Sequence, residues 1–253
     1  MTAPTTDSAL YRTMHRQPDA VRHLLATGWD PARQAADRLL EANRVFLVGI
    51  GTSYHAALVG SWLLRAAGAD ARALLSFDVA VYPETVVLRP DDAVIVLAHT
   101  GVKRFSAEAM ARARAAGATV ISIGSLSAEH PGSQLVLRTV ERETSAAFTA
   151  SHLAAMTVLA QVALALGEQR GVAGMVGLGA ALEQLPDQIA DVLAREEDVR
   201  PVAREAVGGR STRPGPARTR RPRWRRSSRC ARPPTGASMP WRWNNSSTAP
   251  SSP

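Results

Sequence analysis

Three segments rich in glycine and hydroxyl side chains stand between apolar stretches and helical patterns. Residues 49–53 are Gly-Ile-Gly-Thr-Ser, residues 98–104 are Ala-His-Thr-Gly-Val-Lys-Arg, and residues 143–149 are Glu-Thr-Ser-Ala-Ala-Phe-Thr. Glycines let backbone N–H groups approach a ligand, hydroxyls add hydrogen-bond donors, and the dipole at a helix N-terminus favours negative charge. The three segments therefore predict binding positions for an anion such as a phosphate group.

The first segment lacks the two common nucleotide-binding motifs. A dinucleotide fingerprint needs a third glycine at position 54, which is Tyr54, and a Walker A loop needs Gly-Lys-Ser/Thr. We therefore expect no nucleotide cofactor. Gly51, Thr52 and Ser53 are candidates for contacts to a phosphate. The alternative is a simple strand-to-helix turn in which Ser53 is the N-cap.

The second segment places two cations at the start of a helical pattern. Lys103 and Arg104 are unfavourable beside the positive end of the helix dipole, and a bound anion would remove that conflict. Thr100 and Gly101 suit a phosphate turn. His99 is either a ligand contact or a structural hydrogen-bonding residue, and the alternative for the whole segment is a solvated helix start.

The third segment offers Thr144 and Ser145, although hydroxyl clusters at helix starts are commonly caps. The remaining histidines outside the segments show no metal-ligand spacing, and we expect neither a metal nor another cofactor. We interpret these histidines as structural or surface residues: His15, His23, His130 and His152.

The elements that position these segments alternate between strands and helices. Strands are expected at residues 45–48, 71–75, 93–98, 119–123 and 135–137, with helices between them. Strands that are apolar throughout belong to a parallel sheet covered on both faces. We predict an α/β fold, a three-layer α/β/α sandwich with a doubly wound, five-stranded parallel sheet. Ligands bind outside the carboxyl ends of such strands, where all three segments lie.

The chain divides by composition into three parts. Residues 1–43 are expected to be N-terminal helices, residues 44–200 the sandwich with its following helices, and residues 204–253 a disordered basic tail. The net charge is +8, but residues 206–253 hold eleven arginines and no acidic residue. The first 205 residues therefore carry 19 basic against 22 acidic side chains and are mildly acidic.

Several features bear on the compartment. The single cysteine, Cys230, excludes an internal disulfide framework, and residues 1–7 lack a signal pattern. We find no apolar run of the roughly 18–20 residues that a membrane span needs. We therefore expect a cytoplasmic protein with no membrane contact.

The three segments together resemble the SIS (sugar isomerase) family, in particular the isomerase half of glutamine–fructose-6-phosphate aminotransferases. Residues 51–56 are Gly-Thr-Ser-Tyr-His-Ala, as in that family. Residues 98–101 stand where the family has Ser-Gln-Ser-Gly, followed by Glu-Thr, and residues 144–149 stand where it has Ser-Thr-Lys-Ala-Phe-Thr. Residues 14–18 are similar to the entry of its isomerase half. The resemblance covers about residues 10–200, one SIS domain.

The resemblance implies a sugar phosphate, of the hexose 6-phosphate class, as the ligand. The implied contacts are Gly51, Thr52, Ser53, His99, Thr100, Gly101, Lys103, Thr144 and Ser145. Three departures concern the second segment. Ala98 lacks the family's serine hydroxyl, His99 replaces a glutamine, and Lys103 replaces a threonine, so a charge stands where the family has a hydroxyl. Family members usually pair SIS domains, which implies a homodimer.

The tail has two explanations. Arginines interleaved with Trp224, Trp241 and Trp243 are compatible with an arm that binds nucleic acid. The alternative is a shifted reading frame after about Arg204. In the shifted frame, permitted codons can hide Lys-Val-Arg-Glu and His-Gly-Pro strings that resemble the family's catalytic motifs. We favour the shifted frame, and nucleic acid is then not an expected partner.

The function expected from the sequence is sugar-phosphate binding with impaired catalysis. In the family, the Glu of the first motif moves a proton between C1 and C2 of the sugar, and the His of the second helps to open the ring. Neither motif is present in this chain, so we name no catalytic residue. Two alternatives stay open: an active phosphosugar isomerase or aminotransferase, and a phosphosugar-sensing module.

Overall fold

The computed structural model describes residues 8–145 and 147–211, and the boundary between two units of the chain falls between Ala203 and Arg204. Within the described ranges the helices are α1 (Ala9–His15), α2 (Gln17–Thr27), α3 (Trp29–Leu40), α4 (Thr52–Ala66), α5 (Ser76–Val81), η1 (Pro83–Thr85), α6 (Arg104–Ala115), α7 (Ala150–Gln169), α8 (Met175–Ala194) and α9 (Glu196–Ser211). The strands are β1 (Arg44–Gly49), β2 (Ala71–Leu75), β3 (Asp92–Leu97), β4 (Thr119–Gly124) and β5 (Leu135–Arg138).

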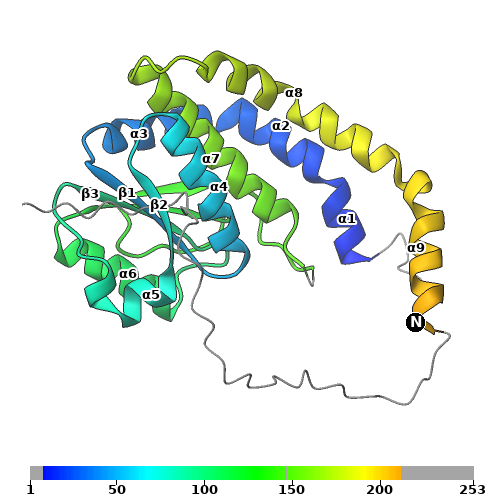
Figure 1. Cartoon of the computed structure of the whole chain (residues 1–253), viewed down its shortest axis with the longest axis horizontal. Helices are drawn as coiled ribbons and strands as arrows, with labels where there is room; N and C mark the ends of the chain where they lie inside the picture. Colours follow the sequence, from blue (N-terminus) through cyan, green and yellow to red (C-terminus); the bar gives the residue numbers. More distant parts are fainter. Residues whose placement is uncertain (1–7, 146, 212–253) are drawn as a thin grey trace, which may run out of the picture. The chain divides into compact units, whose positions relative to one another are not determined.

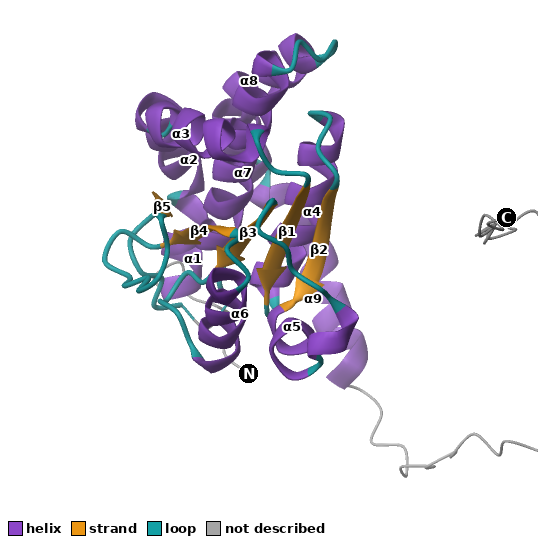
Figure 2. Cartoon of the chain, turned by 90° about the vertical axis from the view of Figure 1, so that its left-hand side faces the viewer, coloured by secondary structure: helices purple, strands orange, loops and turns teal. Residues whose placement is uncertain are grey.

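The five strands form one parallel sheet in the order β2-β1-β3-β4-β5. The first strand, β1, lies inside the sheet; the chain goes from it outward to β2 and then crosses back to β3 on its other side, so the direction of winding reverses between β1 and β3. Helices cover both faces, with α5 and α6 on one side and α3, α4 and α7 on the other (Figures 1 and 2). The prediction of a doubly wound, five-stranded α/β/α sandwich is confirmed.

Alternate residues of each central strand supply the two layers of the core. In β1, Val45 and Leu47 pack in the cluster that faces α3, α4 and α7, whereas Phe46 and Val48 pack in the cluster that faces α5 and α6. β3 repeats this arrangement, and all of its residues are buried. Both faces are covered, and this explains why these strands are apolar throughout instead of alternating with polar residues.

Helix α7 is the central helix of the larger layer. It packs against α3 and α4 and buries fourteen of its twenty residues. By length and composition it could cross a membrane, which corrects the prediction that no segment has that character. In this fold, however, 78% of its most apolar window is buried inside the domain, as expected of a core helix.

The strand predictions agree with the structure to within one residue at each end, and the helices differ more. Helix α8 begins at Met175 and ends at Ala194, after the predicted strands. Helix α9 was not predicted, and it continues to Ser211. The helix thus extends into the predicted tail, over residues 204–211, and the rest of that tail lies outside the described residues.

Candidate functional site

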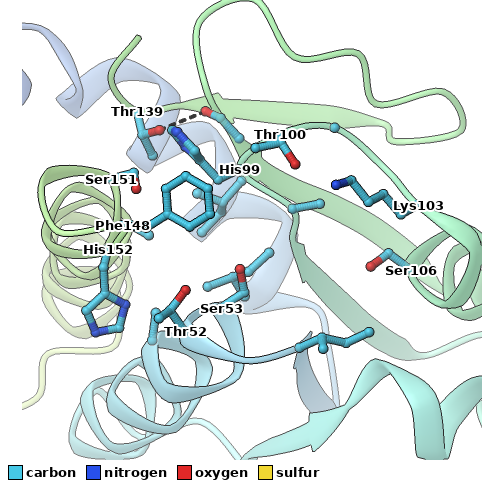
Figure 3. Close-up of a pocket in the computed structure, with 18 residues that line it drawn as sticks. Thr52, Ser53, His99, Thr100, Lys103, Ser106, Thr139, Phe148, Ser151 and His152 are labelled. Carbon is cyan, nitrogen blue, oxygen red and sulfur yellow. Dashed lines mark hydrogen bonds between the residues drawn. The ribbon is translucent and has the colours of Figure 1, made fainter. Parts of the chain in front are cut away.

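A cavity of about 260 Å³ lies at the carboxyl edge of the sheet, beside the point where the winding reverses between β1 and β3. This is the position at which doubly wound sheets bind ligands. Figure 3 shows its walls, which come from the ends of β3 and β4 and from the first turns of three helices. The polar side chains that line it are Thr52, Ser53, His99, Thr100, Lys103, Ser106, Thr139, Ser151 and His152.

The first turn of α4 forms one wall. Gly51 is the N-cap residue and has φ 60°, a conformation that favours glycine, and a Cβ on Gly49 would lie 2.6 Å from the carbonyl carbon of Ser53. The interpretation of Ser53 as the N-cap is therefore wrong, because Ser53 is the second residue of the helix. Among the described residues no side chain caps this helix end, so its N–H groups remain available to an anion.

The first turn of α6 forms the opposite wall. Lys103 is the N-cap residue, and its side chain makes no cap hydrogen bond. Gly101, with φ 94°, turns the chain so that Thr100 and Lys103 both reach the cavity (Figure 3). The first turn has no acidic residue, and Lys103 has no ion-pair partner within residues 8–145 and 147–211. The conflict between its charge and the helix dipole is therefore left uncompensated.

The first turn of α7 differs because a carboxylate already occupies it. Glu143 Oε1 accepts hydrogen bonds from the Thr149 N–H at 2.9 Å and the Ser145 hydroxyl at 2.8 Å. Its Oε2 accepts from the Ser151 N–H at 3.1 Å and the Ser151 hydroxyl at 2.6 Å. Burial alone would raise the pKa of Glu143, but the bonds from Ser151, Thr149 and Ser145 outweigh burial, and the pKa is lowered.

Two histidines line the part of the cavity next to α7. His99 Nε2 accepts a long hydrogen bond of 3.4 Å from the Glu143 N–H, and its ring lies 6.1 Å from the Phe148 ring. Burial lowers the pKa of His99. Burial, and then repulsion by His55, lowers the pKa of His152. Both imidazoles are therefore neutral at pH 7.

The structure brings six of the nine predicted site residues to this cavity: Thr52, Ser53, His99, Thr100, Gly101 and Lys103. Gly51 lies in the adjacent turn. Thr144 lines a separate hollow with Thr13 and Arg16 instead, and Ser145 is buried and bonded to Glu143.

Sequence reasoning missed four polar lining residues: Ser106, Thr139, Ser151 and His152. The interpretation of His152 as a structural or surface residue is corrected, because it lines the cavity. Ser151 and His152 are the second and third residues of α7, so the rule that ligands meet helix N-termini could have found them. Thr139 directly follows the edge strand β5, so the rule that ligands bind outside the carboxyl ends of strands could have found it.

No group of three His, Cys, Asp or Glu side chains that could hold a metal ion occurs in the described part of the chain. The described residues form a doubly wound α/β domain, and its polar cavity is bordered by two uncapped helix N-termini and by Lys103. Residues 38–165 match the family described as SIS domain, and the chain belongs to that family.

Relatives and solved structures agree with this assignment. Glutamine–fructose-6-phosphate aminotransferase [isomerizing] from Pyrococcus horikoshii is 24% identical over 198 residues, which are 77% of this chain and 33% of the relative. The chain thus spans about a third of that relative's length. The C-terminal domain of the corresponding aminotransferase from Francisella tularensis superimposes with a TM-score of 0.67 at 16% identity, covering 81% of this chain and 60% of that one.

A third neighbour is a complex. The Vibrio vulnificus NanR protein complexed with ManNAc-6P has a TM-score of 0.55 at 13% identity, covering 74% of this chain and 70% of that chain. The comparisons confirm the predicted SIS domain and its likeness to the aminotransferase isomerase domain.

Proposed function

We propose that this domain binds a sugar phosphate of the hexose 6-phosphate class, with the phosphate between the first turns of α4 and α6. The observation that carries the proposal is the pairing of two uncapped helix N-termini with Lys103 around one cavity. Each helix end offers unbonded N–H groups and a positive partial charge. The hydroxyls of Thr52, Ser53 and Thr100 add neutral donors to the same place.

The ligand class is supported by the family and by the rest of the cavity. Beyond Lys103 the walls combine one aromatic ring, Phe148, with the hydroxyls of Thr139 and Ser151 and the neutral His99 and His152. Such groups suit a hydroxyl-rich ring or chain that carries no charge of its own. The NanR protein complexed with ManNAc-6P supports a phosphorylated sugar in this fold.

We further propose that this chain binds its ligand with little or no isomerase activity. Moving a proton between neighbouring sugar carbons needs a base within hydrogen-bond reach of the substrate. In the family that base is a glutamate, and among the described residues that line the cavity none is Asp or Glu; the neutral imidazoles of His99 and His152 are the bases that remain, so turnover by this chain would implicate one of them. The proposed frame shift after Arg204 would account for the missing catalytic carboxylate, and the DNA sequence across codons 200–215 tests it.

The binding proposal is tested by substituting the lysine. Lys103→Met removes the charge at the cavity and should weaken fructose 6-phosphate binding about tenfold or more, the equivalent of about 1.4 kcal/mol for one charge-assisted hydrogen bond. Arg104→Met is the matched control, because it removes a neighbouring cation that does not line the cavity. Isothermal titration calorimetry measures both, and equal losses in the two variants would contradict the proposed phosphate position.

We also propose a cytoplasmic homodimer. The family supports the dimer, because its members usually pair SIS domains. Light scattering during size-exclusion chromatography should give twice the chain mass of 26.9 kDa. A monomer mass at micromolar concentration would refute the dimer.

A further inference from the structure

Three helices point their N-termini at the cavity, and they are not equivalent. Thr52 and Ser53 open α4, Lys103 and Ser106 lie in the first turn of α6, and Ser151 and His152 open α7. An uncapped helix N-terminus attracts an anion wherever it is accessible. If all three ends were open, a phosphorylated sugar could bind in several orientations, with its phosphate at any one of the three helices.

Glu143 removes one of these possibilities. Its carboxylate lies on the N-terminus of α7, where it accepts from the N–H groups of Thr149 and Ser151 and from the Ser151 hydroxyl. Thr149, the N-cap residue, makes no cap hydrogen bond with its own side chain. The anion at this helix end thus belongs to the protein and comes from six residues before the N-cap.

The carboxylate is charged under ordinary conditions. Five groups of Ser145, Thr149 and Ser151 donate to it, and hydrogen bonds from these residues lower its pKa against the effect of burial. A second anion at the same helix end would meet both an occupied set of donors and a like charge. Among the described residues, no carboxylate accepts a hydrogen bond from the first-turn N–H groups of α4 or α6, and neither helix end has a side-chain cap.

We propose that Glu143 acts as a built-in anion that closes the α7 end of the cavity to phosphate and so fixes the direction in which the ligand lies. The phosphate goes to α4 and α6, and the sugar carbons lie beside Phe148, Ser151 and His152 (Figure 3). Glu143 is a positioning residue that acts through the helix end and does not line the cavity. The inference rests on the proposed sugar-phosphate binding.

A purely structural role for Glu143 gives a different expectation. A helix cap stabilises α7 by about 1 kcal/mol and has no consequence for where an added anion binds. Anion selection instead predicts that removing the charge opens a second phosphate position. The two roles are therefore separated by a measurement that locates phosphate on the protein, not by stability alone.

The experiment follows backbone amide resonances by ¹H–¹⁵N NMR during titration of the full chain with inorganic phosphate. In the wild type, the amides of Thr52, Ser53 and Arg104 should shift and saturate, whereas those of Thr149 and Ser151 should stay in place. In Glu143→Gln, the Thr149 and Ser151 amides should shift as well. Glu141→Gln, an equal charge change two residues away at an exposed position, should behave as the wild type.

Each result decides something. Wild-type shifts at Thr149 and Ser151 as large as those at Thr52 overturn the inference, and this arm is informative even if Glu143→Gln does not fold. A folded Glu143→Gln protein with the wild-type pattern also overturns it, while the proposed function stands. The absence of any saturable shift at α4 and α6 in the wild type refutes the proposed function, and the inference with it.

Discussion

Lowering the pH from 7 to 5 should destabilise this domain because His130 is held where it cannot take up a proton. The residue lies in the loop between β4 and β5 and is 7% exposed, and neither ring nitrogen has a hydrogen-bond partner in the described part of the chain. A Cβ on Gly124 would overlap the ring, so the imidazole packs directly on the β4 backbone. Burial, followed by repulsion from Arg138, lowers the pKa of His130 to about 4.

The magnitude follows from the difference between the folded pKa of about 4 and the ordinary value of 6.5. As the pH falls below 6.5, the unfolded chain binds a proton at His130 that the folded chain does not, so stability is lost. Between pH 7 and pH 5 this linkage amounts to about 2 kcal/mol, and the loss ends below the folded pKa.

The assay is urea unfolding followed by circular dichroism at several pH values, comparing the wild type with His130→Leu. Leucine fills similar space without a titrating group, so its free energy of unfolding should fall by about 2 kcal/mol less than that of the wild type between pH 7 and pH 5. His23→Gln, at an exposed position, serves as the control and should keep the wild-type profile. Parallel profiles for the wild type and His130→Leu would refute the reasoning.

Three further predictions concern the scaffold and can be measured by the same unfolding assay. Arg44→Met should cost about 3–5 kcal/mol, because it leaves the fully buried carboxylate of Asp92 without the bond of 2.6 Å that balances its charge; a loss below 1 kcal/mol would contradict this. Gly60→Ala should cost about 1–3 kcal/mol, since its Cβ would lie 2.6 Å from Leu159 Cδ1 at the α4–α7 contact. Because folding lowers the pKa of Glu143, its carboxylate stabilises the domain above the ordinary value of 4.5, and this stabilisation is lost as the pH falls below it. The free energy of unfolding of Glu143→Gln should therefore fall less steeply with acid than that of the wild type.

The sheet and the positions of two of the three candidate loops at the cavity could be predicted because their signals are local. A continuous apolar run such as residues 93–98 is typical of a strand in a parallel sheet that is covered on both faces. The glycines that turn each strand into the following helix are also visible in the sequence, and Gly51 and Gly101 do have positive φ angles. These features depend on residues within one strand-turn-helix unit.

The third loop could not be predicted because its structure depends on contacts that residue type alone does not specify. The hydroxyls of Thr144 and Ser145 predict a binding role, but Glu143 accepts hydrogen bonds from Ser145, Thr149 and Ser151, and His152 lines the cavity instead. A buried glutamate is rare, so the sequence favoured the hydroxyls as the functional groups. The position of the Glu143 charge at the first turn of α7 is therefore evident only from the folded structure.

Sugar-phosphate binding is tested most directly by comparing fructose 6-phosphate with fructose for the wild-type chain, by calorimetry at about 150 mM salt. Because the proposed phosphate position joins the open ends of α4 and α6 with the Lys103 charge, we expect saturable binding of fructose 6-phosphate at one site per chain. Binding of unphosphorylated fructose should be at least about a hundredfold weaker, the equivalent of about 2.8 kcal/mol. Equal affinity for the two sugars, or no binding of the phosphorylated sugar at millimolar concentration, would contradict it.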